Sequence, residues 1–102
     1  MIRSVRETKR ALKSLARAPR IVRVNYLVWR GQVEESGLDA VRRVPGYHDE
    51  PLRGKLREVR SVRLGRSYRL FYRVIAVDAV EAVLVEEVNR HDYKEIERLF
   101  DH

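Results

Sequence analysis

The chain has 102 residues, which is enough for one compact domain and too few for two. It contains no cysteine, so disulfide bridges, cysteine nucleophiles and cysteine-ligated zinc are excluded, as is typical of proteins from a reducing compartment. The net charge is +7, and 19 of the 22 basic residues lie in residues 1–77. This bias suits a polyanion such as nucleic acid, and equally a solvated arginine-rich surface.

The N-terminal third of the sequence predicts a short strand followed by two helices. Residues 2–6 favour a first strand, and the apolar residues between Glu7 and Arg17 follow helical spacing. Pro19 suits the first turn of a second helix. Apolar residues recur in that helix every three or four positions and form one stripe, which Ile21 and Val28 widen. The stripe itself contains Val22, Tyr26, Trp29 and Val33.

The remaining two thirds predict a change from helices to strands. Gly37 is expected to end the second helix, residues 38–44 to add one more turn, and Pro45-Gly46 to break the helical region. A loop follows over residues 47–54. Alternating apolar residues and turn signals then predict three strands and a last helix. These elements are expected at residues 59–64, 67–75, 80–88 and 92–100.

The element order indicates the fold class. Helices followed by a meander of strands predict an α+β fold, with N-terminal helices packed on a small antiparallel sheet of three to four strands and a short C-terminal helix. One domain is expected to cover residues 1–102. No signal peptide is apparent, and the longest apolar stretch, residues 74–88, is interrupted by four acidic residues. We therefore expect a soluble cytoplasmic protein with no membrane partner.

Side-chain alternation in the strands predicts which residues face the core. In the second predicted strand, the better core face contains Tyr68, Leu70, Tyr72 and Val74, so Arg69 is expected on the opposite, open side. The preceding hairpin leaves two alternatives. A two-residue loop at Gly65-Arg66 would place Arg60 on the face of Arg69, whereas a longer loop of odd length would place Arg63 there.

The last predicted strand extends the open side. If this strand stays regular, one of its faces contains Val85, Glu87, Asn89 and His91. Glu87 and His91 would then form a polar cleft with Arg69. A plain ion pair between Arg69 and Glu87 at the protein surface is the structural alternative.

The residues available for catalysis are few in type. The three histidines have no ligand-like spacing, so no metal site is expected. The glycines are scattered, so no phosphate-binding loop is expected either. The sequence predicts no cofactor. What remains is a base, an acid and many arginines. Cleavage of RNA without a metal uses these groups: a base deprotonates the 2′-OH, cations stabilise the transition state, and an acid protonates the leaving 5′-oxygen.

Four segments in this order resemble the RelE/ParE superfamily of toxins, and most of all the mRNA interferases of the YoeB type. The segments are residues 46–54, 60–64, 68–72 and 87–93. The resemblance implies a RelE/ParE-like fold and an endoribonuclease that cleaves mRNA on the ribosome. It also implies that a cognate antitoxin protein neutralises the toxin.

The resemblance assigns a role to each matching residue. Glu50 corresponds to the general base, Arg69 to the arginine that holds the scissile phosphate, and His91 to the general acid. Tyr93 corresponds to the aromatic residue that positions the substrate base, although Asp92 separates it from the histidine here. Flanking phosphates would be contacted by three further basic residues, namely Arg53, Lys55 and Arg63.

Alternatives remain at the level of the site and of the function. Some relatives place a histidine near the position of Glu50, so His48 is a second candidate for the base. A ParE-like inhibitor of DNA gyrase without nuclease activity would have the same fold. A plain RNA-binding or protein-binding module would use the same basic surface.

Overall fold

A computed structural model of the chain describes residues 1–90 and Arg98. Its centre is one mixed sheet of five strands in the order β1-β5-β4-β3-β2. The strands are β1 (Val5–Glu7), β2 (Glu50–Pro51), β3 (Arg60–Arg63), β4 (Tyr68–Val77) and β5 (Val80–Arg90). The α+β class is confirmed. The expected antiparallel sheet of three to four strands is not, because the sheet has five strands and β1 pairs with β5 in parallel. The predicted helix at residues 92–100 lies outside the described residues, apart from Arg98.

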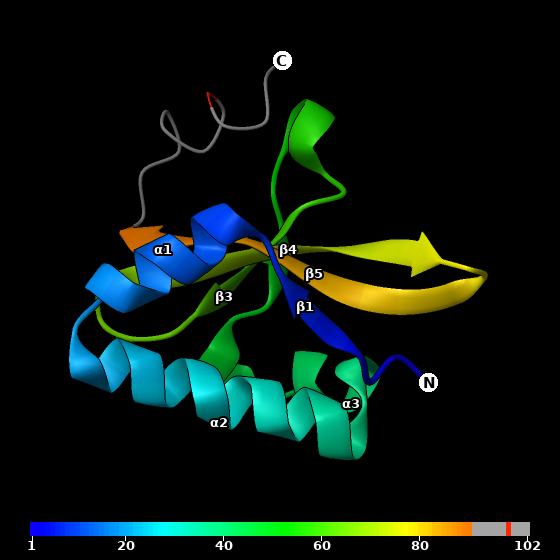
Figure 1. Cartoon of the computed structure of the whole chain (residues 1–102), viewed down its shortest axis with the longest axis horizontal. Coiled ribbons are helices and arrows are strands. Elements are labelled where there is room, and N and C mark those ends of the chain that lie inside the picture. The colour runs from blue at the N-terminus through cyan, green and yellow to red at the C-terminus, as the bar shows by residue number, and fades with distance from the viewer. Residues whose placement is uncertain (91–97, 99–102) are drawn as a thin grey trace.

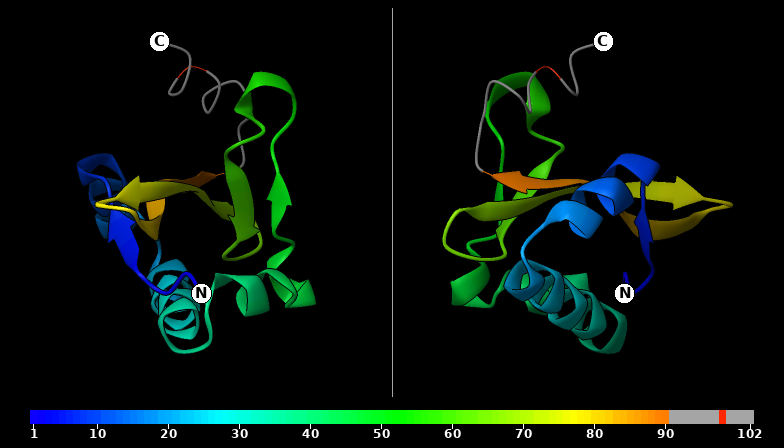
Figure 2. Two further views of the ribbon diagram at one scale, coloured as in Figure 1. Left: turned by 90° about the vertical axis from the view of Figure 1, so that its right-hand side faces the viewer. Right: turned by 60° about the vertical axis from the view of Figure 1, so that its left-hand side comes forward.

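Three α-helices accompany the sheet: α1 (Lys9–Arg17), α2 (Arg20–Ser36) and α3 (Leu38–Arg42). In Figures 1 and 2, α2 and α3 lie together on one side of the sheet, while the segment between β2 and β3 rises on the other side. Gly37 ends α2 and α3 forms the predicted extra turn. Within the described residues, no helix has the length and apolar character that a membrane span requires.

The first strand forms because β1 pairs in parallel with the middle of β5, with Val5 opposite Val83. Glu7 belongs to this strand, whereas the sequence placed it at the start of the first helix. The helix begins after Thr8, whose Oγ accepts a hydrogen bond from the Ala11 amide at 3.0 Å and donates one to the carbonyl of Glu86 at 3.0 Å. This one side chain thus both caps α1 and attaches it to β5.

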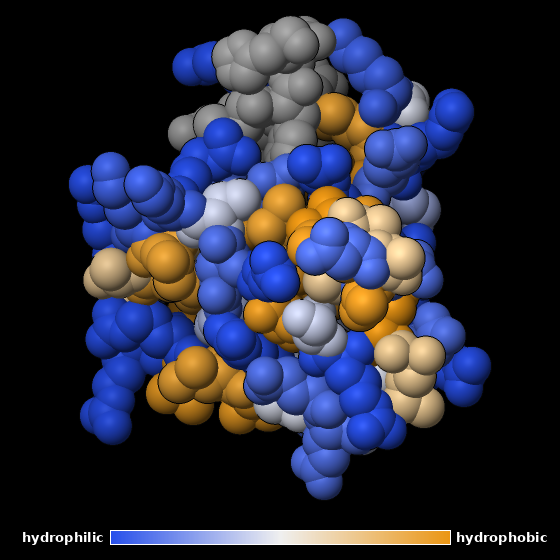
Figure 3. Space-filling model, turned by 45° about the vertical axis from the view of Figure 1, so that its right-hand side comes forward, coloured by the Kyte–Doolittle hydropathy of each residue, from blue (hydrophilic) through white to orange (hydrophobic). Residues whose placement is uncertain are grey.

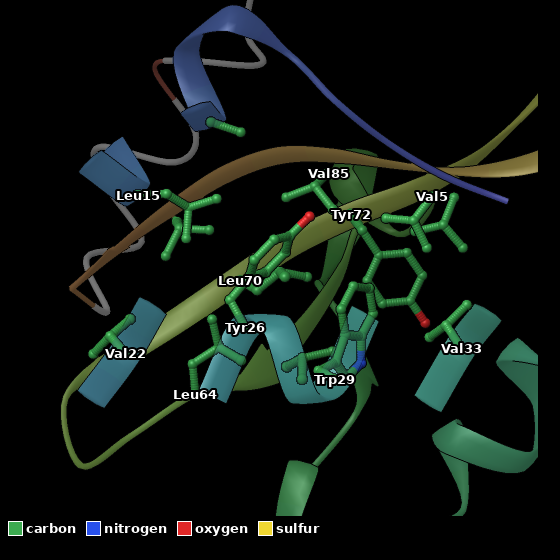
Figure 4. Close-up of a cluster of buried hydrophobic side chains, with 14 of the residues drawn as sticks. Val5, Leu15, Val22, Tyr26, Trp29, Val33, Leu64, Leu70, Tyr72 and Val85 are labelled. Atoms are coloured by element: carbon green, nitrogen blue, oxygen red, sulfur yellow. The ribbon is translucent and has the colours of Figure 1, made fainter. Parts of the chain in front are cut away.

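The main core lies between α2 and the sheet, around the fully buried Trp29 (Figure 4). All four residues of the predicted stripe on α2 are buried, because their spacing places them on one helix face. Ile21 and Val28 do not widen that face: they are 62% and 51% exposed. The predicted core face of β4 is confirmed, since Leu70 and Tyr72 are fully buried.

A second, smaller cluster lies on the opposite face of the sheet. Phe71 points away from α2, yet it is fully buried, because the segment between β2 and β3 covers it. Leu52 and Val59 of that segment pack against it, with Leu56 partly buried beside them. This cluster attaches the segment to the sheet. The polar side chains of that face therefore lie around the edges of the cluster.

A β-bulge in β5 changes the predicted alternation of side chains. Tyr72 pairs with Val85 and the preceding Phe71 pairs with Glu87, so Glu86 is the extra residue. Val85 is therefore buried in the main core, whereas Glu87 lies on the opposite face. The expectation that these two residues share a face is wrong, because the strand is not regular at this point.

Candidate functional site

The polar candidates gather on the face of the sheet that points away from α2, here called the open face. Residues directly opposite each other in neighbouring strands point to the same side of a sheet. One row runs across four strands through Glu50, Ser61, Phe71 and Glu87. The next row contains Arg63, Arg69 and Asn89. The structure thus brings Glu50, Arg63 and Arg69 to two neighbouring rows of the same face, from β2, β3 and β4.

The hairpin register decides between the two arginines of β3. Arg63 is opposite Arg69, because five residues separate the two and the connection has odd length. Arg60 is opposite Tyr72 and lies on the core face. Arg63 is exposed and also lines a surface pocket of about 350 Å³ together with Asn25 of α2. Of the two alternatives, Arg63 is therefore the one on the face of Arg69.

Arg69 is held by a neutral partner. Its Nη1 donates a hydrogen bond of 2.9 Å to Oγ of Ser61, which is 1% exposed. The ion pair with Glu87 that the sequence allowed does not form. Glu87 instead lies 3.8 Å from Nε of Arg10 in α1, and it accepts a hydrogen bond from the Val88 amide. The positive charge of Arg69 is consequently not neutralised by Glu87.

Glu50 occupies the short outer strand β2, where it is exposed and has no side-chain partner in the described part of the chain. An exposed carboxylate of this kind is accessible to a ligand on the open face. His48, the alternative base, is also exposed and precedes β2 in a left-handed backbone conformation with φ of 45°. Only Glu50 takes part in the ladder that leads to Ser61.

Between these two candidates, Asp49 forms a buried anchor that the sequence analysis did not single out. Its carboxylate is 1% exposed and accepts hydrogen bonds from Nε of Arg60 at 2.6 Å and from the Tyr72 hydroxyl at 2.7 Å. The same hydroxyl accepts a hydrogen bond from Nε of Arg42 at 3.1 Å. Burial raises the pKa of Tyr72 well above its ordinary value, and the negative charge of the Asp49 carboxylate raises it further. Tyr72 therefore stays protonated and can donate to Asp49.

The remaining predicted site residues divide into two groups. Arg53 and Lys55 are exposed on the segment that covers the open face, and Lys55 lines a pocket of about 290 Å³ together with Arg73 and Glu86. Nε of Arg73 donates to Glu86 at 2.7 Å, so this arginine is neutralised. His91 and Tyr93 lie outside the described residues.

The side of the open face near the end of β5 contains a polar atom without a partner. Asn89 is opposite Arg69, and its Oδ1 is buried without a hydrogen bond from any described residue. Ser61 and Asn89 thus flank Arg69 from the two neighbouring strands. Among residues 1–90, no three His, Asp or Glu side chains lie close enough together to hold a metal ion. The chemistry of the described site is that of one free carboxylate and cationic guanidinium groups.

The surface of the molecule combines charged areas with apolar ones. Of the whole chain, 36% of the residues are charged, and in the view of Figure 3 hydrophilic side chains surround a central area of hydrophobic ones. Several exposed apolar residues lie on the outer side of α2, including Leu27 at 64% exposure. The open face therefore differs from the outer side of α2, because its exposed groups are mainly polar.

No protein-family model matches the sequence, and no curated protein is similar to it in sequence. Solved structures, in contrast, are similar over most of the chain. A YoeB/ParE toxin from Agrobacterium tumefaciens has a TM-score of 0.63 at 17% identity, covering 87% of this chain and 99% of that chain. A doubly substituted RelE toxin of E. coli, in complex with a peptide of its antitoxin RelB, has a TM-score of 0.63 at 26% identity.

The match to that RelE toxin covers 96% of this chain and 93% of that chain. The RelBE2 toxin–antitoxin complex of Mycobacterium tuberculosis also contains a similar chain, with a TM-score of 0.52 at 26% identity over 86% of this chain and 90% of that chain. Each of these matches covers at least 86% of this chain and at least 90% of the similar chain. The chain therefore has the fold of the RelE/ParE superfamily of toxins, as its sequence motifs predict.

Proposed function

We propose that this chain is the toxin of a type II toxin–antitoxin system and acts as a metal-independent endoribonuclease on mRNA at the ribosome. The observation that carries the proposal is the juxtaposition of Glu50, Arg63 and Arg69 on the open face. These residues come from three different strands, and the sequence motifs had assigned all three to RNA cleavage. A shared fold alone would not support this activity.

In this proposal each group on the open face has one task. Glu50, exposed and without a side-chain partner, removes the proton from the 2′-OH of the RNA. The 2′-oxygen attacks the adjacent phosphorus, and Arg69 stabilises the negative charge that develops on the phosphoryl oxygens. His91, which follows β5 directly in sequence, protonates the leaving 5′-oxygen. Tyr93 positions a base, while Arg53, Lys55 and Arg63 bind neighbouring phosphates.

The ribosome would contribute orientation of the mRNA. A small protein with an open, shallow face has few means to force an RNA strand into the geometry for in-line attack. Holding the reacting groups in that geometry can supply a large part of the rate enhancement. We therefore expect much faster cleavage of mRNA on the ribosome than of the same RNA free in solution.

The partner in the cell would be an antitoxin protein. Two of the similar structures are complexes in which a toxin is bound to its antitoxin or to an antitoxin peptide. The chain has a net charge of +7, and Arg63 and Arg69 on the open face form no ion pair with a described carboxylate. An acidic, amphipathic segment would therefore complement this face. Coverage of Arg63 and Arg69 by such a segment would block binding of RNA.

The test is cleavage of a defined mRNA in a reconstituted translation reaction, with ends mapped by primer extension. The wild type is compared with Glu50→Ala, Arg69→Ala and His91→Ala, and with Arg66→Ala in the exposed β3–β4 connection as a control. We expect new ends with the wild type and the control, and a rate lower by about 10²-fold or more in each of the other variants.

Two outcomes would contradict the proposal in different ways. Cleavage that survives all three substitutions would retain the nuclease and reject the site. An intact mRNA, together with loss of DNA supercoiling in a gyrase assay, would establish the ParE-like alternative.

A further inference from the structure

We propose that Ser61 is a positioning residue that orients the guanidinium group of Arg69 toward the scissile phosphate. This inference rests on the proposed function, because it assigns Arg69 to phosphate binding. Ser61 was not among the candidates that the sequence suggested, and it does not itself need to contact the RNA. Its role follows from its burial, from its register in the sheet and from the one hydrogen bond that it forms with Arg69.

The position of Ser61 is unusual for a hydroxyl group. It lies in the middle of β3 and is 1% exposed, between Glu50 of β2 and Phe71 of β4 on the same row of the open face. The apolar cluster around Phe71 adjoins it. A hydroxyl group buried there without a partner would cost stability, so its hydrogen bond to Arg69 is a fixed feature of the fold.

The hydrogen bond involves one particular atom of the guanidinium group. Nη1 donates to Oγ of Ser61, and this is the one side-chain hydrogen bond that Arg69 forms among residues 1–90. Nη1 points to the same side as the Cδ atom, so Nε and Nη2 present their N–H bonds in parallel along the other edge. That edge can bind two phosphoryl oxygens at once. Fixing Nη1 therefore leaves free the edge that is suited to a phosphate.

The neutrality of the acceptor matters as much as its position. Other arginines of the molecule are held by carboxylates: Arg60 by Asp49, Arg73 by Glu86 and Arg30 by Glu7. A carboxylate in place of Ser61 would fix Arg69 equally well but would compensate its charge. Serine restrains the side chain and leaves the whole charge for the substrate. The structure thus distinguishes Arg69 from the arginines that serve the fold.

The experiment is a double-mutant cycle in the same mRNA cleavage reaction, with the variants Ser61→Ala, Arg69→Ala and both together. Ser61→Cys accompanies them because it keeps most of the volume and is a poor acceptor, so it serves if the alanine variant folds badly. Ser67→Ala, in the exposed connection before β4, is the matched serine control. Thermal unfolding of every variant is measured in parallel.

We expect Ser61→Ala and Ser61→Cys to lower kcat by roughly tenfold to a hundredfold, with KM changed much less, and Ser67→Ala to be neutral. In the Arg69→Ala background, Ser61→Ala should have no further effect, because a positioning residue acts only through the group that it positions. A purely structural role would slow both backgrounds alike.

The outcomes separate this inference from the proposed function. If the wild type cleaves no mRNA, the proposed function fails and the role of Ser61 fails with it. If the wild type cleaves and Ser61→Ala is as fast, or if the two substitutions act additively, only the positioning role is overturned. A folded Ser61→Cys variant with full activity would have the same meaning.

Discussion

The two arginines at the ends of β3 have the same charge in opposite surroundings. Arg60 lies on the core face, where its Nε donates to the buried carboxylate of Asp49 at 2.6 Å. Arg63 lies opposite Arg69 on the open face and is exposed. Residues three positions apart in a strand point to opposite sides of the sheet. One arginine therefore serves the fold, and the other is available to a ligand.

This difference predicts opposite effects of the same substitution. Arg63→Ala should raise KM for mRNA several-fold with little change in kcat, and it should reduce the salt dependence of binding by about one phosphate contact. Arg60→Ala should leave KM unchanged and lower the free energy of unfolding, because it leaves Asp49 buried without its cation. Cleavage kinetics at several salt concentrations and urea unfolding measure both effects. Equal KM values for the two variants would contradict this assignment.

At the scale of the elements, the sequence predicted those parts whose pattern is local. The stripe on α2 repeats over several turns, so its spacing correctly predicts which of its residues are buried. The strand β2 was missed and assigned to a loop, because two residues cannot show a periodic pattern. The bulge at Glu86 was missed for a similar reason, since its cause is the pairing with β4 and not the sequence of β5.

The same limit applies to the candidate site. Motifs identified Glu50 and Arg69 one at a time, and strand alternation left Arg60 and Arg63 as alternatives. Only the register of β3 against β4 decides between those two and shows that Ser61 holds Arg69. A serine beside the two arginines and the valine of β3 is the one available signal, and it has no meaning until the facing strand is known.

The placement of β2 depends on Asp49 more than on its own two residues. Asp49 connects the chain just before β2 to Arg60 of β3 and to Tyr72 of β4. Asp49→Ala should therefore lower the free energy of unfolding by about 2–4 kcal/mol, because the partly buried Arg60 and the buried Tyr72 hydroxyl lose their partner together. Urea unfolding measures this value. Asp39→Ala, at a side chain that is 81% exposed, is the control and should cost less than 1 kcal/mol; equal losses would contradict the anchoring role.

For the molecule as a whole, three aromatic side chains connect the helical layer to the sheet. The ring centroid of Trp29 lies 6.1 Å from that of Tyr26 and 5.8 Å from that of Tyr72 (Figure 4). Both tyrosine hydroxyls donate to carboxylates, Tyr26 to Glu7 and Tyr72 to Asp49. Burial first, and then the neighbouring carboxylate, raises the pKa of each hydroxyl well above the ordinary value of about 10.

These two tyrosines predict how the stability of the molecule depends on pH. Below pH 10 they are protonated in both the folded and the unfolded chain, so their contribution to stability is complete. Above pH 10 the unfolded chain loses these protons and the folded chain keeps them, so the free energy of unfolding must fall as pH rises. Tyr26 and Tyr72 together contribute about 2.7 kcal/mol per pH unit to the limiting slope.

Urea unfolding between pH 8 and pH 12, followed by the fluorescence of the single Trp29, measures this slope. Arginine remains charged throughout this range, so most of the cationic groups do not titrate with the tyrosines. Tyr26→Phe should lower stability at pH 8, because the hydrogen bond to Glu7 is lost, and should reduce the slope above pH 10 by about 1.4 kcal/mol per pH unit. A free energy of unfolding that stays constant from pH 10 to pH 12 in the wild type would show that the two hydroxyls are not held protonated by the fold.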